Sequence, residues 1–197
     1  MRSARWGMCG ERSWCGWYDY DVELELESFP TILRDDVSGF GVDGLLPPGD
    51  YELALERFEA LFVLRSERRH SIFDGWNRHR EALLRDGLSS RTLQLLDGSF
   101  TTDKKEPGDI DLAVEVPITS AALAASTGQS PILRLLRGPE MKSAFYCDAY
   151  PIYRLPSDDP SFENVTIRAI RYWTKWFAQT RDGRTKGRIW ARTGGLR

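Results

Sequence analysis

Four residues in the middle of the chain have the types and the spacing to bind a phosphate and a metal ion. Gly98 and Ser99 end a short apolar run, and residues 100–108 form a polar loop after them. Asp109 and Asp111 then open a second apolar run, with one residue between them. Alternate side chains of a strand point to the same face, so these two carboxylates project together. They repel each other unless a cation lies nearby, and oxygen ligands of this kind suit Mg²⁺.

The Gly98-Ser99 pair fits a phosphate site upstream of the carboxylates. Glycine lets the backbone approach a phosphate closely, and N–H groups with a hydroxyl can hold anionic oxygens. Lys104 and Lys105, in the loop between the two halves, could approach the same phosphate or could be ordinary exposed lysines. Gly-Ser alone is common turn chemistry. The two halves together, at this spacing and between apolar flanks, indicate a functional site.

This arrangement resembles the nucleotidyltransferase superfamily that includes DNA polymerase beta. The superfamily pattern is an apolar residue, Gly-Ser, a spacer of about this length and then Asp-apolar-Asp. Gly98, Ser99, Asp109 and Asp111 match it. The resemblance implies a third carboxylate on a later strand, and Asp148 is the position that we expect.

Two further segments resemble a family of small, stand-alone, uncharacterised bacterial nucleotidyltransferase-like proteins. One is the opening segment of residues 44–51, and the other is the Arg-x-Gly-x-x-Lys-Gly element of residues 181–187. The resemblance therefore extends over roughly residues 44–192, although its specific motifs cover little of that length.

The resemblance implies a Mg²⁺-dependent nucleotidyltransferase with a two-metal site. Gly98 and Ser99 would hold the β,γ-phosphates of a nucleoside triphosphate (NTP), ATP among them. Asp109 and Asp111 would hold the Mg²⁺ ions, and Asp148 would serve as their third ligand or as the general base. Further positive charge would come from basic residues of the loop and of the C-terminal element: Lys104, Lys105, Arg184 and Lys186.

The sequence does not identify the acceptor, and a tRNA end, a protein hydroxyl or a small molecule would each fit. Small stand-alone domains of the superfamily often work in toxin–antitoxin or defence systems, which suggests by analogy a toxin–antitoxin partner protein. A competing hypothesis is a non-catalytic module that keeps the fold for binding or regulation. Another is an RNA-binding protein that uses the basic C-terminal end, which predicts strong salt dependence and no metal requirement. No aromatic RNA-binding motif supports that reading.

The composition bounds these hypotheses. With 197 residues and 41% hydrophobic residues, the chain fits one domain, or one domain with an appendage. The formal net charge of −2 hides an asymmetry, because Asp182 is the only acidic residue from Thr166 to the end, among many Lys and Arg. Such an end could face a triphosphate or a nucleic acid, but a solvated helix face is the commoner outcome.

Several other classes are disfavoured. Cys9, Cys15 and Cys147 form no disulfide framework, and His70 and His79 do not share a helix face as zinc ligands would. The sequence has no Gly-x-Ser-x-Gly for a hydrolase nucleophile. No apolar segment is long enough to cross a membrane, and the N-terminus lacks the apolar core of a signal peptide, so we expect no membrane association and a cytoplasmic protein.

Residues 1–43 read as an N-terminal extension of a domain at 44–197. The extension is rich in Trp, Tyr, Gly and charged residues without a helical period, and residues 21–27 alternate apolar and acidic residues as a strand does. Two interpretations remain open: an ordered arm or extra strand, or a segment translated from an upstream start that is not native. In the second case the true start would lie near Val37 or Val42.

The order of expected elements predicts the fold class. A helix capped by Asp50, a helix from Ser71 to Gly87, strands near 92–96, 110–116, 142–153 and 186–190, a helix pair in 119–137 and a last long helix from Asp158 follow from periodicity and capping. This order indicates an α+β, nucleotidyltransferase-like domain: a small mixed β-sheet with helices packed on one side. We expect the basic cluster Arg65, Arg68 and Arg69 to be solvated. The aromatic stripe of the last helix should be core and not a base-stacking surface.

Overall fold

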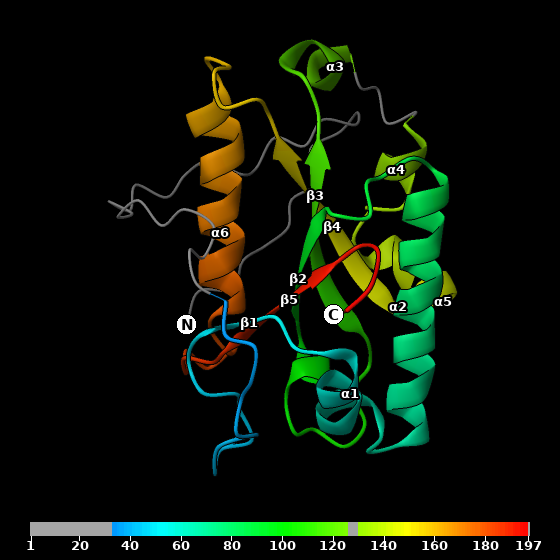
Figure 1. Ribbon diagram of the computed structural model, residues 1–197, viewed down its shortest axis with the longest axis vertical. Coiled ribbons are helices and arrows are strands. Elements are labelled where there is room, and N and C mark those ends of the chain that lie inside the picture. Colours follow the sequence, from blue (N-terminus) through cyan, green and yellow to red (C-terminus); the bar gives the residue numbers. More distant parts are fainter. Residues whose placement is uncertain (1–32, 126–129, 197) are drawn as a thin grey trace.

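The computed structural model of the protein describes residues 33–125 and 130–196 (Figure 1). Its strands are β1 (Asp50–Tyr51), β2 (Leu93–Asp97), β3 (Ile110–Pro117), β4 (Cys147–Arg154) and β5 (Arg188–Arg192). Its α-helices are α1 (Leu55–Phe58), α2 (Glu67–Arg85), α3 (Ser120–Ala125), α4 (Pro131–Arg134), α5 (Lys142–Phe145) and α6 (Arg168–Phe177). Short 3₁₀ or π segments are η1 (Glu59–Val63), η2 (Ser99–Thr101), η3 (Pro139–Met141) and η4 (Glu163–Ile167). The strand expected at residues 21–27, like most of the expected extension, lies outside the described residues.

One mixed sheet organises the domain. Its strand order is β1-β5-β2-β3-β4. β1 runs parallel to β5 and β3 runs parallel to β4, whereas β2 is antiparallel to both of its neighbours. The predicted α+β class with a mixed sheet is therefore confirmed. No helix in the described part of the chain is long and apolar enough to cross a bilayer.

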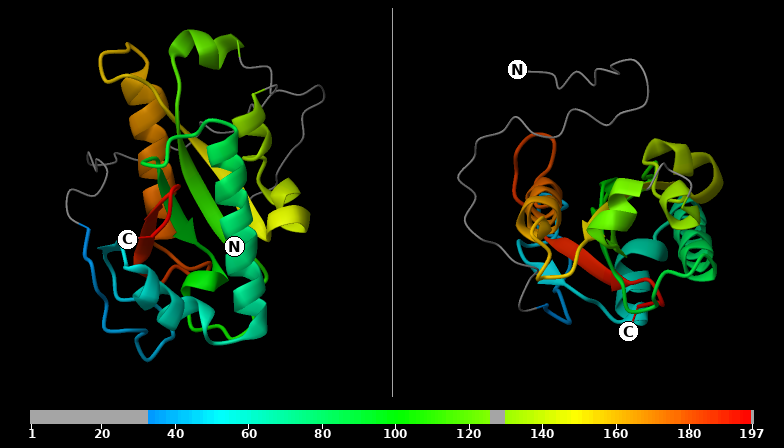
Figure 2. Two further views of the ribbon diagram at one scale, coloured as in Figure 1. Left: turned by 45° about the vertical axis from the view of Figure 1, so that its right-hand side comes forward. Right: turned by 90° about the horizontal axis from the view of Figure 1, so that it is seen from above.

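Both faces of this sheet are covered by helices. Alternate residues of β3, among them Ile110 and Leu112, pack into a core with α1, η1 and α2. Ala113, on the other face, packs with α6 through Ile170 and Trp173. Figures 1 and 2 show α6 on one side of the sheet and α2 on the other. Most helices thus lie on one side, as expected, while α6 covers the second face and explains the nearly continuous apolar character of β3.

A buried arginine fixes the loop between the two halves of the motif. Arg69 is fully buried on α2. Its guanidinium donates hydrogen bonds to the carbonyl oxygens of Phe62 (2.8 Å), Phe100 (2.8 Å), Thr102 (2.6 Å) and Lys104 (2.6 Å). Burial lowers the pKa of Arg69 to about 10, so the side chain stays charged at neutral pH. The expectation that this basic cluster is solvated is wrong for Arg69, because loop carbonyls replace water around it.

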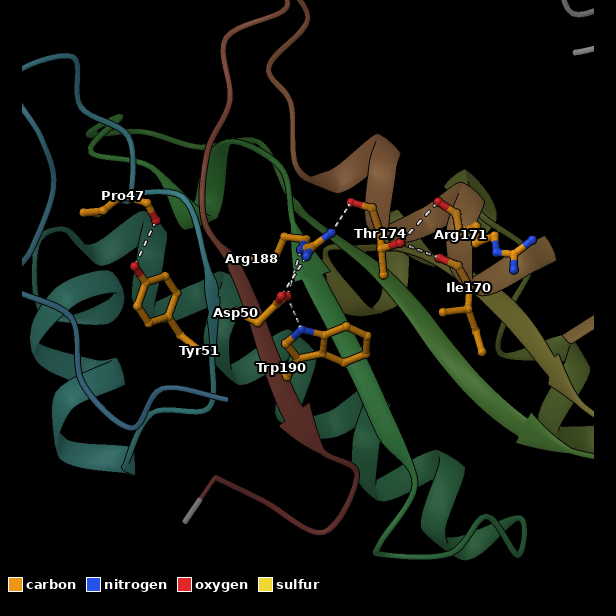
Figure 3. Close-up of polar contacts among 8 residues, drawn as sticks. All are labelled: Pro47, Asp50, Tyr51, Ile170, Arg171, Thr174, Arg188 and Trp190. Carbon is orange, nitrogen blue, oxygen red and sulfur yellow. Dashed lines mark hydrogen bonds and ion pairs between the residues drawn. The ribbon is translucent and has the colours of Figure 1, made fainter. Parts of the chain in front are cut away.

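The edge of the sheet is held by Asp50, which sequence analysis placed at a helix N-cap. Asp50 instead lies in β1 and accepts hydrogen bonds from Arg188 (2.8 and 2.7 Å) and from the indole N–H of Trp190 (2.7 Å). Arg188 also donates to the carbonyl of Thr174 at 2.7 Å, near the C-terminal end of α6. Figure 3 shows that this network joins β1, β5 and α6. The local sequence around Asp50 could not predict this network, because Arg188 and Trp190 lie 138 and 140 positions further along the chain.

Three other boundaries differ from the predictions. Helix α2 begins at Glu67, before the predicted Ser71, because the Ser66 side chain caps it by accepting a bond from the Arg69 N–H. The segment predicted as one strand from residue 142 forms α5 first, and β4 begins at Cys147. The last helical region begins at Glu163 and not near Asp158. Cys147 is buried, as predicted for a small hydrophobic residue.

The described residues before the domain pack against it. Arg34 donates its backbone N–H to the carbonyl of Asp50 at 2.9 Å and accepts from the N–H of Glu52 at 2.9 Å. Val37 is buried in the core, and Phe40 makes an edge-to-face contact with Phe62. These contacts belong to the described part of the expected extension.

Replacing Arg69 with leucine should destabilise the protein by about 3 kcal/mol or more, because the loop carbonyls would lose their donors while staying buried. Arg85→Leu, an exposed arginine of the same helix, is the matched control and should change stability by no more than about 0.5 kcal/mol. Urea unfolding followed by circular dichroism measures both. Equal effects in the two variants would contradict the role assigned to Arg69.

Candidate active site

Three carboxylates lie side by side across three neighbouring strands. Asp97 ends β2, and Asp111 and Asp148 are each the second residue of their strand, β3 and β4. The register pairs Asp97 with Asp111 and Asp111 with Asp148. Asp111 lies two residues before Ala113, so this row is on the face of the sheet that α6 covers. Asp109, just before β3, joins them, and these four residues are called the carboxylate cluster below.

The predicted trio Asp109, Asp111 and Asp148 is brought together by the fold. The ammonium group of Lys142 contacts Oδ2 of Asp109 at 2.8 Å and Oδ2 of Asp148 at 3.2 Å. Asp111 follows Asp109 by two residues and is the direct cross-strand neighbour of Asp148. Residues nearly forty positions apart in the sequence therefore lie beside one another in the fold.

Gly98 packs its backbone directly against Asp111. Its φ of 84° is in the left-handed region, which favours glycine. A Cβ atom added there would clash with Oδ2 of Asp111 and would lie 3.1 Å from its Cγ. Ser99 follows as the first residue of η2, where its carbonyl accepts a bond from the Thr102 hydroxyl at 2.8 Å. The Gly-Ser turn and the Asp-x-Asp strand therefore meet, which is what a joint phosphate and metal site requires.

The cluster concentrates negative charge in a largely buried place. Burial, and then the charges of Asp109, Asp97 and Asp148, raise the pKa of Asp111 to about 7, although Lys142 acts in the opposite direction. Burial disfavours the ionised form of Asp111, and the neighbouring carboxylates, which the strand register places beside it, disfavour it further. Strongly perturbed carboxyl groups of this kind mark candidate functional sites.

Lys186 does not lie where sequence analysis expected a free phosphate contact. Its side chain is buried and forms an ion pair with Asp97. Burial raises the pKa of Asp97 to about 6, and Lys186, with hydrogen bonds from Gly98 and Thr101, counteracts that shift. Lys186 thus neutralises the Asp97 end of the carboxylate row.

The two loop lysines are exposed. Lys104 and Lys105 lie on the surface of the segment between η2 and β3. Their backbone carbonyls accept hydrogen bonds from Arg69 and Ser66, respectively. Arg184, also expected to add positive charge, pairs with Asp182 in an exposed turn. The structure therefore brings the carboxylates and Gly98 together but leaves these basic side chains at the surface.

The donor set has the chemistry that a divalent cation prefers, but its present arrangement is not that of a metal site. The cluster offers only carboxylate oxygens, and Oδ1 of Asp148 is buried without a hydrogen-bond partner. Its four carboxylates face the ammonium groups of Lys142 and Lys186, which leaves an excess of negative charge when all are ionised. As the side chains stand, no group of three or more His, Cys, Asp or Glu within residues 33–125 and 130–196 is arranged to hold a metal ion. Lys142 lies between two of the carboxylates, so a bound metal would require it to move aside.

Sequence reasoning missed Asp97 and Lys142. Asp97 had a signal, since it directly precedes Gly98 at the end of a predicted strand and shares a face with Leu95. Lys142 had none, because the chain turns back between α5 and β4 at Tyr146, whose φ is 54°. That turn brings Lys142 beside Asp148. In a continuous strand the two residues, six positions apart, would lie too far from each other to form an ion pair.

Comparison with known proteins places the chain in a family. Residues 39–191 match DUF6932, which is described as a family of unknown function, and the chain belongs to that family. The matched region contains the whole carboxylate cluster, Gly98, Lys142 and Lys186. No curated protein and no solved structure matched the chain. The family description names no reaction.

The crowding of the cluster predicts a pH-dependent stability. The pKa of Asp111 is raised from its ordinary value of 3.8 to about 7. The folded state therefore binds this proton more tightly than the unfolded state, and stability should fall as pH rises from about 4 to about 7. In metal-free buffer at pH 8, Asp111→Asn should be more stable than the parent protein by on the order of a few kcal/mol, and the difference should vanish near pH 4.

Urea unfolding across this pH range, with a chelator present, measures the effect. Asp74→Asn, an exposed acid on α2, is the control and should show no gain at pH 8. An Asp111→Asn protein less stable than the parent at pH 8 would contradict the prediction.

Proposed function

We propose that this protein is a Mg²⁺-dependent nucleotidyltransferase of the DNA polymerase beta-like superfamily, transferring a nucleotide from an NTP to a hydroxyl of an acceptor. The observation that carries the proposal is the meeting of Gly98 with Asp111, beside Asp109 and Asp148. A fold alone does not require a glycine backbone against a carboxylate row, whereas a triphosphate held next to metal ions does. The activity requires a compartment with NTPs and Mg²⁺, which the cytoplasm supplies.

Asp109, Asp111 and Asp148 are the residues that would hold the metal. Bound there, Mg²⁺ would neutralise the charge of the triphosphate and of the leaving pyrophosphate, and would make the acceptor hydroxyl more acidic. The carboxylates of Asp109 and Asp111 would keep the cation at the end of β3. Gly98 and Ser99 would bind the phosphate oxygens through backbone N–H groups and the Ser99 hydroxyl.

The reaction is a displacement at the α-phosphorus. The acceptor oxygen forms a bond to this phosphorus, the bond from the phosphorus to the β-phosphate oxygen breaks, and pyrophosphate leaves. The proton of the acceptor hydroxyl must pass to a base, and Asp148 has a carboxylate oxygen without a hydrogen-bond partner. Asp148 would therefore accept the proton, or would serve as the third metal ligand while solvent accepts it.

Sequence analysis expected Lys186 to supply positive charge to the phosphates of the NTP. In the proposed mechanism Lys142 supplies it. Its ammonium is half-exposed and contacts two carboxylates of the cluster. With Asp109, Asp111 and Asp148 holding the metal, the Lys142 ammonium would be released from these carboxylates and could contact the phosphates of the NTP. The positive charge of Lys186 is already committed to Asp97.

The same lysine supports the competing hypothesis of a non-catalytic module. A tethered ammonium between Asp109 and Asp148 could neutralise them permanently and make a metal unnecessary. The module would then keep the fold and lose metal-dependent NTP binding. Binding of an NTP with and without Mg²⁺ separates the two hypotheses.

Titration calorimetry of each NTP with and without Mg²⁺ tests the proposal. We expect at least one NTP to bind only with Mg²⁺, and we expect the double variant Asp109→Ala/Asp111→Ala to lose this binding. Transfer of labelled α-phosphate to cellular RNA, protein and metabolite fractions would then identify the acceptor.

Glu115→Gln is the matched control. Glu115 lies on β3, on the same face as Asp111, but pairs with Arg154 away from the cluster. It should bind NTPs as the parent protein does. Absence of NTP binding under both conditions would reject the catalytic proposal in favour of the non-catalytic module.

A further inference from the structure

Helix α6 presents basic and aromatic residues along its outer face. Arg168, Tyr172, Lys175 and Trp176 are all exposed, and their spacing places them on one face of a helix. The exposed fraction is 61% for Trp176 and 37% for Tyr172. The prediction that the aromatic stripe is core is confirmed for Trp173 but wrong for Trp176. We call Arg168, Tyr172, Lys175 and Trp176 the α6 stripe.

The aromatic side chains of the stripe are held in a fixed orientation. The rings of Tyr172 and Trp176 are parallel, with an interplanar angle of 6° and centroids 6.2 Å apart. Tyr172 also contacts the buried Trp173 edge to face, with centroids 5.1 Å apart. The indole of Trp176 therefore presents most of its surface to water beside the parallel ring of Tyr172.

A continuous series of rings connects the stripe with the carboxylate cluster. Trp173 packs on Tyr150 with ring centroids 4.9 Å apart. Tyr150 lies on β4 two residues after Asp148, on the same face, and the Asp148 carboxylate adds to the effect of burial in raising the pKa of Tyr150. Tyr172 contacts Trp173, so the ring contacts run from the stripe to Tyr150. The stripe is therefore beside the proposed site and not on a remote surface.

We propose that the α6 stripe binds a single-stranded nucleic acid, and that this strand is the acceptor of the nucleotide. The inference rests on the proposed function and gives its acceptor a chemical class. Trp176 and Tyr172 would stack on unpaired bases, while Arg168 and Lys175 would contact the phosphates between them. Aromatic rings interleaved with basic residues are the means by which proteins bind single strands with little sequence preference.

Charge distribution supports a polyanion at this place. Beyond the helix, the chain continues with Arg181 and Arg184, which are exposed, and Asp182 is the only acid in that part of the sequence. The carboxylate cluster itself would repel a strand, but the stripe lies outside it and a bound divalent cation would reduce that repulsion. The strand would thus be held by its bases and backbone on α6 while its terminal hydroxyl reaches the cluster. In this arrangement the 3′-terminal hydroxyl is the nucleophile for the displacement described above.

Fluorescence anisotropy with a labelled 12-nucleotide single-stranded RNA of mixed sequence tests the proposal. Trp176→Ala should raise the Kd roughly 5- to 100-fold, as expected for the loss of one base–aromatic stack. Lys175→Gln should lower the slope of log K against log salt by about 0.7, as expected for one phosphate contact to a single strand. The same RNA annealed to its complement should bind more weakly, because its bases are not available for stacking.

Leu64→Ala is the control, since Leu64 is an exposed apolar residue (64%) outside the stripe. It should bind RNA as the parent protein does. RNA binding that is absent in the parent protein, or equal in the parent and Trp176→Ala proteins, would overturn the proposal. An effect of Trp176→Ala on NTP binding without any effect on RNA binding would assign the indole to the base of the NTP and would also overturn it.

Measuring NTP binding by calorimetry and RNA binding by anisotropy, both on the parent protein, keeps the two proposals separate. Mg²⁺-dependent NTP binding together with no RNA binding would leave the nucleotidyltransferase proposal intact. It would reject only the proposal that a single-stranded nucleic acid is the acceptor. If the parent protein binds no NTP, the proposed catalytic function is rejected whether or not RNA binds.

Discussion

Mutual repulsion among four carboxylates is the constraint around which this domain is built. Asp97, Asp111 and Asp148 are direct neighbours across three strands, so the sheet itself brings like charges together. Cross-strand like charges are unfavourable, and burial makes them more so. Lys186 and Lys142 approach the row from opposite ends of the site, and each comes from a segment that lies outside the strands bearing the carboxylates. The stability of the domain therefore depends on how these charges are paired, and the proposed metal site would use the same charges.

Much of this site could be predicted from the sequence, because its main residues are local in the chain. Gly98 and the Asp109/Asp111 pair depend on turn chemistry and on strand alternation, which are properties of a few consecutive residues. Asp148 was predicted because the resemblance to the nucleotidyltransferase superfamily implies a third carboxylate on a later strand, and a strand was expected around this residue. The α+β class followed from the order of the apolar runs, and the structure confirms it.

What could not be predicted depends on contacts between distant segments. Asp50 looks like a helix cap in isolation, but Arg188 and Trp190 bind it across the sheet edge. Arg69 looks like one of several surface arginines until the loop carbonyls close around it. In each case a charged side chain found its partners far along the chain, and periodicity carries no information on such partners.

The place of β5 in the sheet has a consequence for how the protein is made. β5 lies between β1 and β2, although it is the last strand in the sequence, and the Lys186 that precedes it is separated by 89 positions from its partner Asp97. During synthesis β2 and β3 can pair early, but one edge of β2 stays open until β5 has left the ribosome. Asp97 lacks its lysine until that point, because Lys186 lies just before β5. The sheet is therefore completed, and Asp97 gains its ion-pair partner, in the same late step of synthesis.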